Sequence, residues 1–411
     1  MTTGLAENVR NLRRTAGWSQ EQLAEATDLS VGTVRKVEQG GDVRMETLHA
    51  LARALDVPTS ALFATETTTP VVGDEANRRY LVELRKALMP PVGLAAPMTV
   101  LGQAEELSAL RRATADAHAL YWADRYDSVA KRLPGLLRSA EAAVETLEGE
   151  EQQHAVIARC HALLLTGKYL TQVRQYDMAY FALAEAIRLS RETGQTLTAA
   201  TGVVGLCWLL LRQDRFDESE QLAAQTAAEI EPRMSEATPA RLAVWGELWL
   251  RVASATARNN RPDVAQEARR MAGTAASALN GEHAKFPDHW GGFGPVTAEL
   301  KAVEDLALLG NARGVLRRSD EGLLSSKAIR NFGKPTAPSW DRHRLDVAKA
   351  HATLKQHQDA MDVLMSVRHS SGEWIKHQPM ARYVMTDLLK TRKRTLTQDM
   401  RDMAAHLGVT G

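Results

Sequence analysis

The sequence predicts an all-α protein that combines a small five-helix N-terminal domain with a long array of helical hairpins. Aromatic residues make up only 5% of the chain, and Ala, Leu, Arg and Glu dominate, a composition that favours helix over sheet. Apolar residues recur at helical spacing, and one turn pattern repeats along the chain. We divide the 411 residues into a first domain (1–64), a linker with a connecting helix (65–100) and a repeat domain (101–411).

Charge and cysteine usage exclude several classes of protein. Lys and Arg total 51 against 50 Asp and Glu, so the bulk charge predicts no polyanionic partner. No uncharged apolar run approaches the roughly 18 residues of a membrane helix, and the first residues lack the apolar core of a signal peptide. Cys160 and Cys207 have no metal-type spacing, so we expect buried thiols in a cytoplasmic protein.

Five short helices are predicted in the first domain. Ser19 precedes the second helix, with Gln22 three residues later as in a capping box, and Ser30 caps the third. Gly40 and Gly41 end the third helix. The apolar positions expected to form a small core are Leu5, Val9, Leu12, Leu23, Ala24, Val34, Val37, Leu48, Leu51, Ala52 and Leu55.

The second and third helices are joined by a short turn and describe a helix-turn-helix. Arg35 and Lys36 point outward from the third helix, where cations meet phosphates and base edges in a major groove. The charge count argues the other way, because residues 1–64 hold seven Arg and Lys but eight acids, a formal charge of −1. The residues alone leave DNA binding and a plain five-helix bundle as equal alternatives.

Three strings in this domain carry a family pattern: GWSQEQLA at 17–24, LSVGTVRKVEQG at 29–40, and ETL through ALDV at 46–57. They resemble the Cro/C1-repressor (XRE) type of helix-turn-helix. The resemblance implies a phosphate contact by Gln20 and an ion pair between Arg13 and Glu38. Because Val31 offers only methyl contact and Gly32 no side chain, we expect sparse direct readout supported by DNA shape. The candidate DNA-binding residues are Gln20, Val31, Gly32, Thr33, Arg35, Lys36 and Arg44.

A linker is predicted after this domain. Residues 65–76 are rich in Thr and contain Pro70 and Gly73. A helix is expected at 77–88, and residues 92–100 have no helical period. This stretch is either a connector packed on the repeat domain or a hinge that transmits a signal.

A turn pattern recurs beyond residue 100 at intervals of about 40 to 50 residues. Each copy lies between two apolar helical stretches, which is typical of a helical-hairpin solenoid whose units bury a core only by stacking. The fifth unit fits best when shifted by one residue, to Val315. The six turns begin near Arg125, Gln175, Arg215, Arg261, Gly310 and His357, and small residues expected where paired helices pack are Gly167, Ala186, Cys207, Ala253 and Ala348.

These units resemble tetratricopeptide repeats, although they are longer than the usual 34 or so residues. Together with the first domain they resemble the actinobacterial helix-turn-helix/tetratricopeptide regulators, on RYD at 125–127, FGP at 293–295 and RHRLDVA at 342–348. More distantly, the architecture is similar to the peptide-pheromone (RRNPP-type) sensors of Gram-positive bacteria. That resemblance implies quorum sensing through a peptide held in the concave groove of the repeats.

In tetratricopeptide units the first helix of each hairpin lines the groove. Thirteen residues occupy such positions here; six are Arg or Lys and one is acidic, so the groove would attract an acidic peptide or a terminal carboxylate. The alternative is an ordinary charged face, with Trp208, Trp245 and Trp249 in the core. The candidates are Arg111, His118, Tyr121, Trp122, His161, Lys168, Gln172, Trp208, Arg212, Glu247, Arg258, Arg342 and Lys349.

No catalytic or metal-binding constellation is apparent in the sequence. His283 and His289 lack a third ligand, and GGFG at 291–294 has neither the preceding strand nor the Gly-Lys-Ser/Thr of a phosphate loop. We predict a flexible inter-repeat loop there, and no metal, cofactor or enzyme activity.

We therefore expect a transcription regulator whose binding to a double-stranded DNA operator is gated by a short, acidic peptide. One such domain reads a half-site, so we expect a homodimer that reads half-sites about 34 Å apart. Two rivals remain. The repeats are either a docking scaffold for a protein partner, with no peptide ligand, or an enzyme such as a phosphatase.

Overall fold

The predicted all-α fold class is confirmed. The computed structural model describes residues 3–16, 18–41, 43–55, 57, 59–63, 75–91, 106–233, 235–284, 290–391 and 396–409. Within these ranges the regular structure is helical, apart from an isolated antiparallel bridge between His283 and Phe293. None of the described helices is long and apolar enough to cross a membrane.

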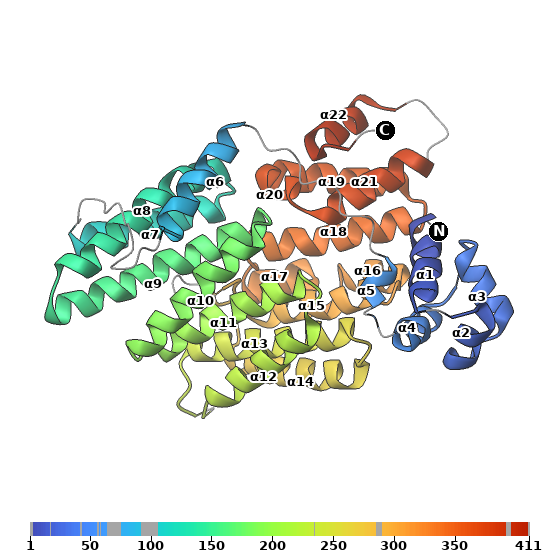
Figure 1. Ribbon diagram of the computed structural model, residues 1–411, viewed down its shortest axis with the longest axis horizontal. Helices are drawn as coiled ribbons and strands as arrows, with labels where there is room; N and C mark the ends of the chain where they lie inside the picture. Colours follow the sequence, from blue (N-terminus) through green and yellow to red (C-terminus); the bar gives the residue numbers. More distant parts are fainter. Residues whose placement is uncertain are drawn as a thin grey trace.

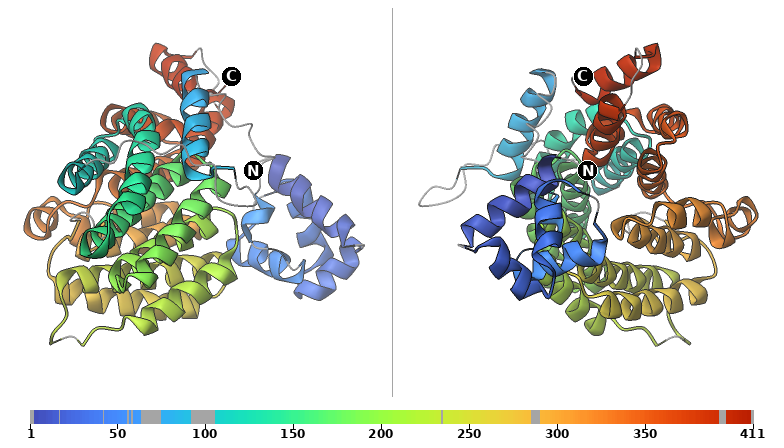
Figure 2. Two further views of the ribbon diagram at one scale, coloured as in Figure 1. Left: turned by 60° about the vertical axis from the view of Figure 1, so that its left-hand side comes forward. Right: turned by 90° about the vertical axis from the view of Figure 1, so that its right-hand side faces the viewer.

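The N-terminal domain contains the five predicted helices and forms a separate lobe beside the repeats (Figures 1 and 2). The Ser19 hydroxyl accepts the Gln22 N–H at 3.1 Å, while the Gln22 side chain accepts the Ser19 N–H at 2.7 Å, so the predicted capping box is present. All eleven predicted apolar positions join one cluster, to which Leu62 is added. The helices are α1 (Thr3–Thr15), α2 (Gln20–Thr27), α3 (Val31–Glu38), α4 (Met45–Ala54) and α5 (Thr59–Leu62).

Six helical hairpins come next along the chain, with their turns where the sequence predicts them. The residue just before each second helix's N-cap has a left-handed backbone, with φ between 59° and 72°; these residues are Asp124, Arg174, Asp214, Asn260, Gly310 and Lys355. The hairpins are α7 (Leu107–Trp122) with α8 (Tyr126–Thr146), α9 (Gly149–Gln172) with α10 (Tyr176–Glu192), α11 (Thr196–Leu211) with α12 (Phe216–Glu229), α13 (Pro239–Arg258) with α14 (Pro262–Leu279), α15 (Pro295–Leu308) with α16 (Ala312–Arg318), and α18 (Ala337–Thr353) with α19 (His357–Ser370).

Small residues bring the two helices of a hairpin together, as the repeat pattern predicts. A Cβ on Gly167 would overlap the Leu183 side chain. The Ser219 hydroxyl donates to the backbone carbonyl of Cys207 at 3.2 Å, so α11 and α12 meet at their two small residues. Ala253 and Ala348 are completely buried. One apolar cluster runs through five of the hairpins, while the α15–α16 hairpin has its own.

The fifth hairpin is irregular, which explains its poor fit to the repeat. Its second helix, α16, is short and continues as the 3-10 turn η1 (Gly322–Leu324) and helix α17 (Ser326–Phe332). Val315 is completely buried in the packing of this unit. Three further helices, which the repeat pattern does not anticipate, come after the sixth hairpin: α20 (Gly372–Lys376), α21 (Pro379–Thr391) and α22 (Gln398–Leu407).

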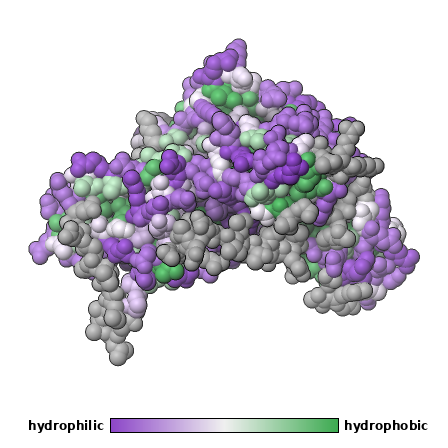
Figure 3. Space-filling view, turned by 90° about the horizontal axis from the view of Figure 1, so that it is seen from above, coloured by the Kyte–Doolittle hydropathy of each residue, from purple (hydrophilic) through white to green (hydrophobic). Residues whose placement is uncertain are grey.

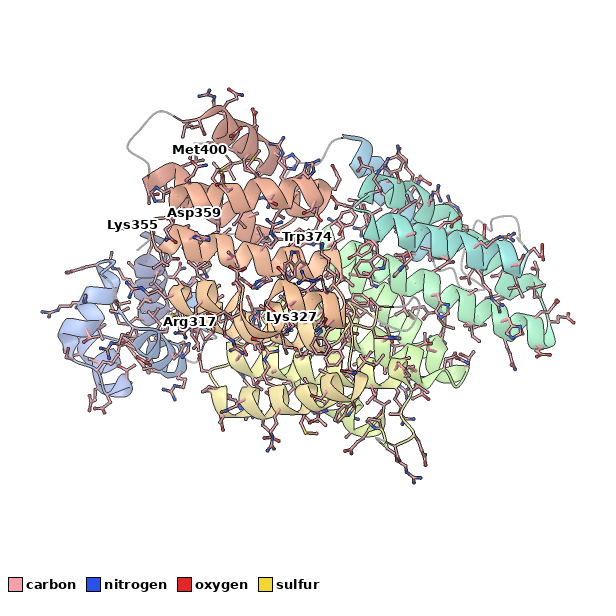
Figure 4. The ribbon with its side chains drawn as sticks, turned by 180° about the vertical axis from the view of Figure 1, so that it is seen from behind. Arg317, Lys327, Lys355, Asp359, Trp374 and Met400 are labelled. Atoms are coloured by element: carbon pink, nitrogen blue, oxygen red, sulfur yellow. The ribbon has the colours of Figure 1, made fainter. Side chains whose placement is uncertain are left out.

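The end of the repeat domain returns to its beginning. The Asp124 carboxylate, in the first hairpin turn, accepts the backbone N–H groups of Glu373 and Trp374 at 2.7 Å each. The His377 and Tyr126 rings lie 6.1 Å apart between centroids. In Figure 4, Trp374 lies where the last hairpin meets the first ones. The inward helices of the repeats therefore converge on a partly enclosed centre.

The connecting helix α6 (Glu75–Leu88) packs on α8, and its Leu84 and Leu88 join the main apolar cluster. The predicted helix at 77–88 is therefore present, and residues 64–74 and 92–105 lie outside the described ranges.

Figure 3 shows a mostly hydrophilic face with separate small hydrophobic patches.

The loop before α15 is anchored by two close approaches. The Trp290 ring lies directly against Gly205 of α11, and the Phe293 ring against Gly246 of α13, so that a Cβ on either glycine would overlap the ring. Both aromatic side chains are buried. The described part of the predicted flexible loop, residues 290–294, is therefore held in the core, because the two glycines leave space for its rings.

We predict that Gly246→Ala destabilises the repeat domain by roughly 1–3 kcal/mol, because the added methyl must displace the Phe293 ring in a packed core. Gly273→Ala is the matched control: it lies within α14 with open space around it, and should stabilise by about 0.5–1 kcal/mol. Urea unfolding of both full-length variants measures the difference. Equal stability of the two variants would contradict the packing described here.

Candidate nucleic-acid interface and central pocket

A buried ion pair joins α1 to α3. The Arg13 guanidinium donates to both Glu38 oxygens, at 2.6 and 3.1 Å, and to the Trp18 carbonyl at 2.7 Å. The Glu38 side chain is only 2% exposed. Burial favours the neutral acid, but the hydrogen bonds from Arg13 and Gln20 and the Arg13 charge outweigh it, so the pKa of Glu38 is lowered. The predicted Arg13–Glu38 pair is therefore confirmed.

Gln20 extends this pair to the surface. Its amide nitrogen donates to Glu38 at 2.7 Å, and its amide oxygen accepts from the Arg35 guanidinium at 3.2 Å. Arg35 also lies 3.6 Å from the exposed Glu21 carboxylate. The chain of contacts from Arg13 through Glu38 and Gln20 to Arg35 fixes α2 against α3 and orients an exposed cation.

Most candidate DNA-binding residues belong to α3, which lies at the edge of the N-terminal lobe away from the repeats (Figure 1). Gly32, Arg35, Lys36 and Arg44 are exposed, whereas Val31 packs partly against the domain core. Thr33, Lys36 and Arg44 border a shallow hollow together with two residues that sequence reasoning missed, Val43 and Thr47. These two come from the loop after α3 and the first turn of α4, for which no side-chain pattern gives a signal.

A second candidate site is a pocket at the centre of the repeat domain. It holds about 70 Å³ of free space between the side chains and opens to solvent. We call it the central pocket. Helices α7, α9, α11, α13, α15 and α18 contribute to it, together with the loop before α15 and the segment before α18. Seven of the thirteen candidate ligand-binding residues line it: Tyr121, Trp122, Lys168, Gln172, Trp208, Glu247 and Arg342.

Trp208 is surrounded by cations. The guanidinium groups of Arg342, Arg251 and Arg212 lie 4.7, 5.1 and 5.6 Å from the centre of its ring, and the Lys301 ammonium lies 5.5 Å from it. Arg251, Lys301 and Arg342 also line the central pocket. Such contacts are attractive, since the indole face is electron-rich, but they bring like charges together in a buried place.

Lys168 occupies the opposite part of the central pocket. Its ammonium lies 5.0 Å from the centre of the Trp122 ring, 5.2 Å from that of Trp290 and 3.3 Å from the buried His118 ring nitrogen. Burial disfavours the ammonium and lowers the pKa of Lys168 to about 7, against a weaker opposing effect of Glu247. Glu247 is the lining carboxylate and accepts the backbone N–H groups of Trp290 and Gly291, at 3.2 and 2.9 Å.

Six candidate ligand-binding residues do not line the central pocket, and their assignment stays a prediction. Arg111 is exposed, and His161 is only half-buried, whereas His118 is buried behind Lys168. Arg212 reaches the Trp208 ring from outside the lining, Arg258 pairs with Glu304 at 2.5 Å, and Lys349 lies over the Tyr383 ring. The extended helices and the returning C-terminal segment give these positions neighbours that an open tetratricopeptide groove would not provide.

Sequence reasoning missed other lining residues. Arg251 lies four positions after Glu247 on α13 and so on the same face, a signal that could have found it. Trp290 lies in the loop before α15, and Lys301 lies on α15, in the unit where the sequence loses the repeat register. The remaining missed residues are Leu250, Gly291, Gly292, Thr297, Thr336, Pro338 and Ser339.

A metal centre has no support in the described ranges. No three His, Cys, Asp or Glu side chains gather there as a metal site would require. His289 lies outside these ranges, and the described His283 is paired in the bridge to Phe293 through its backbone.

Residues 9–62 match the helix-turn-helix family. The match covers α2, α3 and α4 completely and supports a DNA-binding transcription regulator, in a family that is generally not enzymatic. No curated protein and no solved structure gives a significant match to the chain. The Trp208 and Lys168 surroundings in the repeat domain are therefore interpreted from their chemistry alone.

We predict that Glu38→Gln destabilises the helix-turn-helix domain by roughly 2–3 kcal/mol, because it leaves the Arg13 charge buried without a counter-charge. Amide hydrogen exchange of α1–α3 in the full-length chain measures this. Glu21→Gln, which removes an exposed carboxylate, is the control and should change little. Because the folded pKa of Glu38 is lowered, its contribution is present above the ordinary glutamate range and disappears as the pH falls below it.

We predict that Lys36→Ala relaxes the preference for one base pair and costs about 1–3 kcal/mol, whereas Arg35→Ala weakens all sequences alike and lowers the salt slope by about one. The measurement is binding to duplexes selected from a random-sequence library, at several salt concentrations. Arg188→Ala removes an exposed arginine of α10 as the control. Unchanged affinity of both α3 variants would exclude α3 as the reading helix.

Proposed function

We propose that the chain is a transcription regulator whose DNA binding responds to a short acidic peptide in the central pocket. The observation that carries this proposal is the charge of the pocket lining. Among the lining residues that the structure describes, four are cationic, Lys168, Arg251, Lys301 and Arg342, and Glu247 is the one carboxylate. An anionic ligand is the partner that such a lining stabilises best.

The burial of these cations costs folding free energy. Burial lowers the pKa of Arg251 and that of Lys301, and it lowers the pKa of Arg342 to about 10. Among the described residues, Arg251 and Arg342 have no carboxylate within ion-pair distance; they donate to the Val204 carbonyl and the Gln378 side chain. A buried charge without a counter-charge destabilises a fold by several kcal/mol, so a bound carboxylate would recover stability.

The enclosed part of the central pocket is small. Its free space is about 70 Å³, well below the roughly 300–1,000 Å³ of usual small-molecule sites, so a bound peptide extends into the part of the pocket that is open to solvent. Trp122, Trp208 and Trp290 add flat apolar surface, and Thr297, Thr336 and Ser339 add hydroxyl groups. This combination suits a peptide of few residues with more than one carboxylate.

Dimerisation is part of the proposal. A single helix-turn-helix reads one half-site, so two copies would read half-sites about one helical turn apart. A ligand changes operator affinity only if it binds the DNA-competent and incompetent states differently.

One observation favours the second candidate, a docking scaffold without a peptide ligand. Tyr180 and Phe181, adjacent on α10, are 44% and 41% exposed. Such an apolar pair on the outside of the repeats would suit a protein partner. The cationic pocket has no role in that alternative, so pocket variants separate the two functions.

We predict that triglutamate binds the full-length protein more tightly than trialanine, that trilysine does not bind, and that Arg342→Gln and Lys168→Gln each weaken triglutamate binding at least tenfold. Calorimetry measures the affinities. Arg188→Gln, which removes an exposed α10 arginine paired with Glu185 and Glu192, is the matched control and should bind normally. Preferential binding of trilysine, or equal binding by all four proteins, would contradict the proposal.

The pH dependence has a definite sign. The pKa of Lys168 in the free protein is about 7, and a bound anion stabilises the ammonium. Above pH 7, binding must take up a proton, so triglutamate affinity should fall by up to about tenfold per pH unit. The Lys168→Gln protein should lack this slope.

A further inference from the structure

The DNA-binding domain touches the repeats at two hairpin turns. The Thr59 hydroxyl at the start of α5 donates to the Asn260 side chain, in the α13–α14 turn, at 2.7 Å. Met45 at the start of α4 approaches Gly310, in the α15–α16 turn, where an added Cβ would lie 3.5 Å from the Met45 side chain. Figure 1 shows the domain against these ends of the hairpins. The two contacts are small, and the two parts have separate apolar cores.

The helices that lead to these turns also line the central pocket. Arg251 on α13 and Lys301 on α15 border the pocket, and each precedes its contact residue, Asn260 or Gly310, by nine positions. Nine residues of helix span about 13 Å. A shift between α13 and α15 at the pocket is therefore carried directly to the surface on which the DNA-binding domain rests.

One carboxylate ties the two helices together between the pocket and the turns. Glu304 on α15 is buried, and its two oxygens lie 2.7 Å from the Lys301 ammonium and 2.5 Å from the Arg258 guanidinium of α13. Arg258 is the last residue of α13, two positions before Asn260. Contacts thus run from Lys301 in the pocket through Glu304 to Arg258, and the backbone leads on from Arg258 to Asn260, whose side chain meets Thr59.

We propose that Glu304 relays anion binding in the central pocket to the DNA-binding domain. An anionic group held by Arg251, Lys301 and Arg342 competes with Glu304 for the Lys301 ammonium, since one buried ammonium cannot face two carboxylates equally well. The weakened Lys301–Glu304 contact removes one of the two ion pairs that fix the Glu304 carboxylate, so the remaining Glu304–Arg258 pair holds α13 less firmly against α15. The two turns then hold the DNA-binding domain less firmly, and binding DNA costs more orientational entropy. This inference rests on the proposed anion site for its signal, but the relay itself is testable without any ligand.

Two variants interrupt the relay at different points, and a third is the matched control. Glu304→Gln removes the shared carboxylate, and Arg258→Gln removes only the partner nearest the turn. Arg261→Gln removes another arginine of the same α13–α14 turn, which pairs with Glu220 at 2.7 Å and has no contact with the relay. All three are made in the full-length chain.

The orientation of the DNA-binding domain is measured by pulsed electron–electron double resonance. Labels are placed at Ala26→Cys on α2 and Thr274→Cys on α14, both exposed, while Cys160 and Cys207 are buried. Affinity for a duplex selected from a random-sequence library is measured in parallel, with unfolding curves to show that each variant is folded.

We expect Glu304→Gln and Arg258→Gln to widen the distance distribution at least twofold and to weaken duplex binding at least threefold, while Arg261→Gln matches the unsubstituted protein. Unchanged width and affinity in both relay variants, or an equal change in the control, overturns the relay. Adding triglutamate to the unsubstituted protein separates the two proposals. Binding without widening overturns the relay and leaves the ligand assignment, whereas widening in the variants with no triglutamate binding supports the relay and contradicts the acidic-peptide ligand.

Discussion

The repeat domain depends on the close approach of its paired helices at one small side chain in each hairpin. Gly167 leaves space for the Leu183 side chain. The Cys207 backbone carbonyl accepts a hydrogen bond from the Ser219 hydroxyl. A larger residue at either place would separate the helices and open a void in a core that tolerates few voids. Since one hairpin cannot bury both of its apolar faces, the hairpins must stack, and stacking turns the first helix of each one inward.

The inward helices converge because the array closes on itself. The Asp124 carboxylate holds the α20 N–H groups, and this contact joins residues about 250 positions apart. Burial raises the pKa of Asp124 to about 6, since the carboxylate has left water for a partly enclosed site. Closure converts a concave surface into a pocket in which Lys168 and Arg251 are buried and Arg342 is half-buried. A fold selected for stability alone gains nothing from such cations, and the proposal of an anionic ligand rests on this cost.

The DNA-binding domain also contains a buried charge that positions other side chains. A buried acid, Glu38, is satisfied by Arg13 and Gln20, and through Gln20 it orients the exposed Arg35. The domain carries its own core, so its internal order does not depend on the repeats. Its orientation does, because only a hydrogen bond at Thr59 and a contact at Met45 attach it to the described hairpin turns. Because the attachment is weak, a modest ligand-binding free energy is enough to change the orientation of the DNA-binding domain.

Local patterns were sufficient for the helices of the first domain and for the six hairpins, but not for α17 or for the C-terminal helices α20, α21 and α22. The capping box at Ser19, the six hairpin turns, the small packing residues and the Arg13–Glu38 pair all come from short-range spacing or from the family resemblance, because each depends on neighbours at a fixed offset or on a known motif. The same spacing selected seven residues that line the central pocket, since helical periodicity decides which face turns inward.

Tertiary structure alone decided how the elements meet. Nothing near Asp124 in the sequence points to α20, and nothing near Gly205 points to Trp290. Lys349 and Arg258 occupy groove positions by spacing. Their side chains instead meet Tyr383, on the C-terminal helix α21, and Glu304, on α15 of the next hairpin. The physical reason is that periodicity specifies a direction from the helix axis, whereas the partner found in that direction depends on distant segments that pack only once the chain has closed.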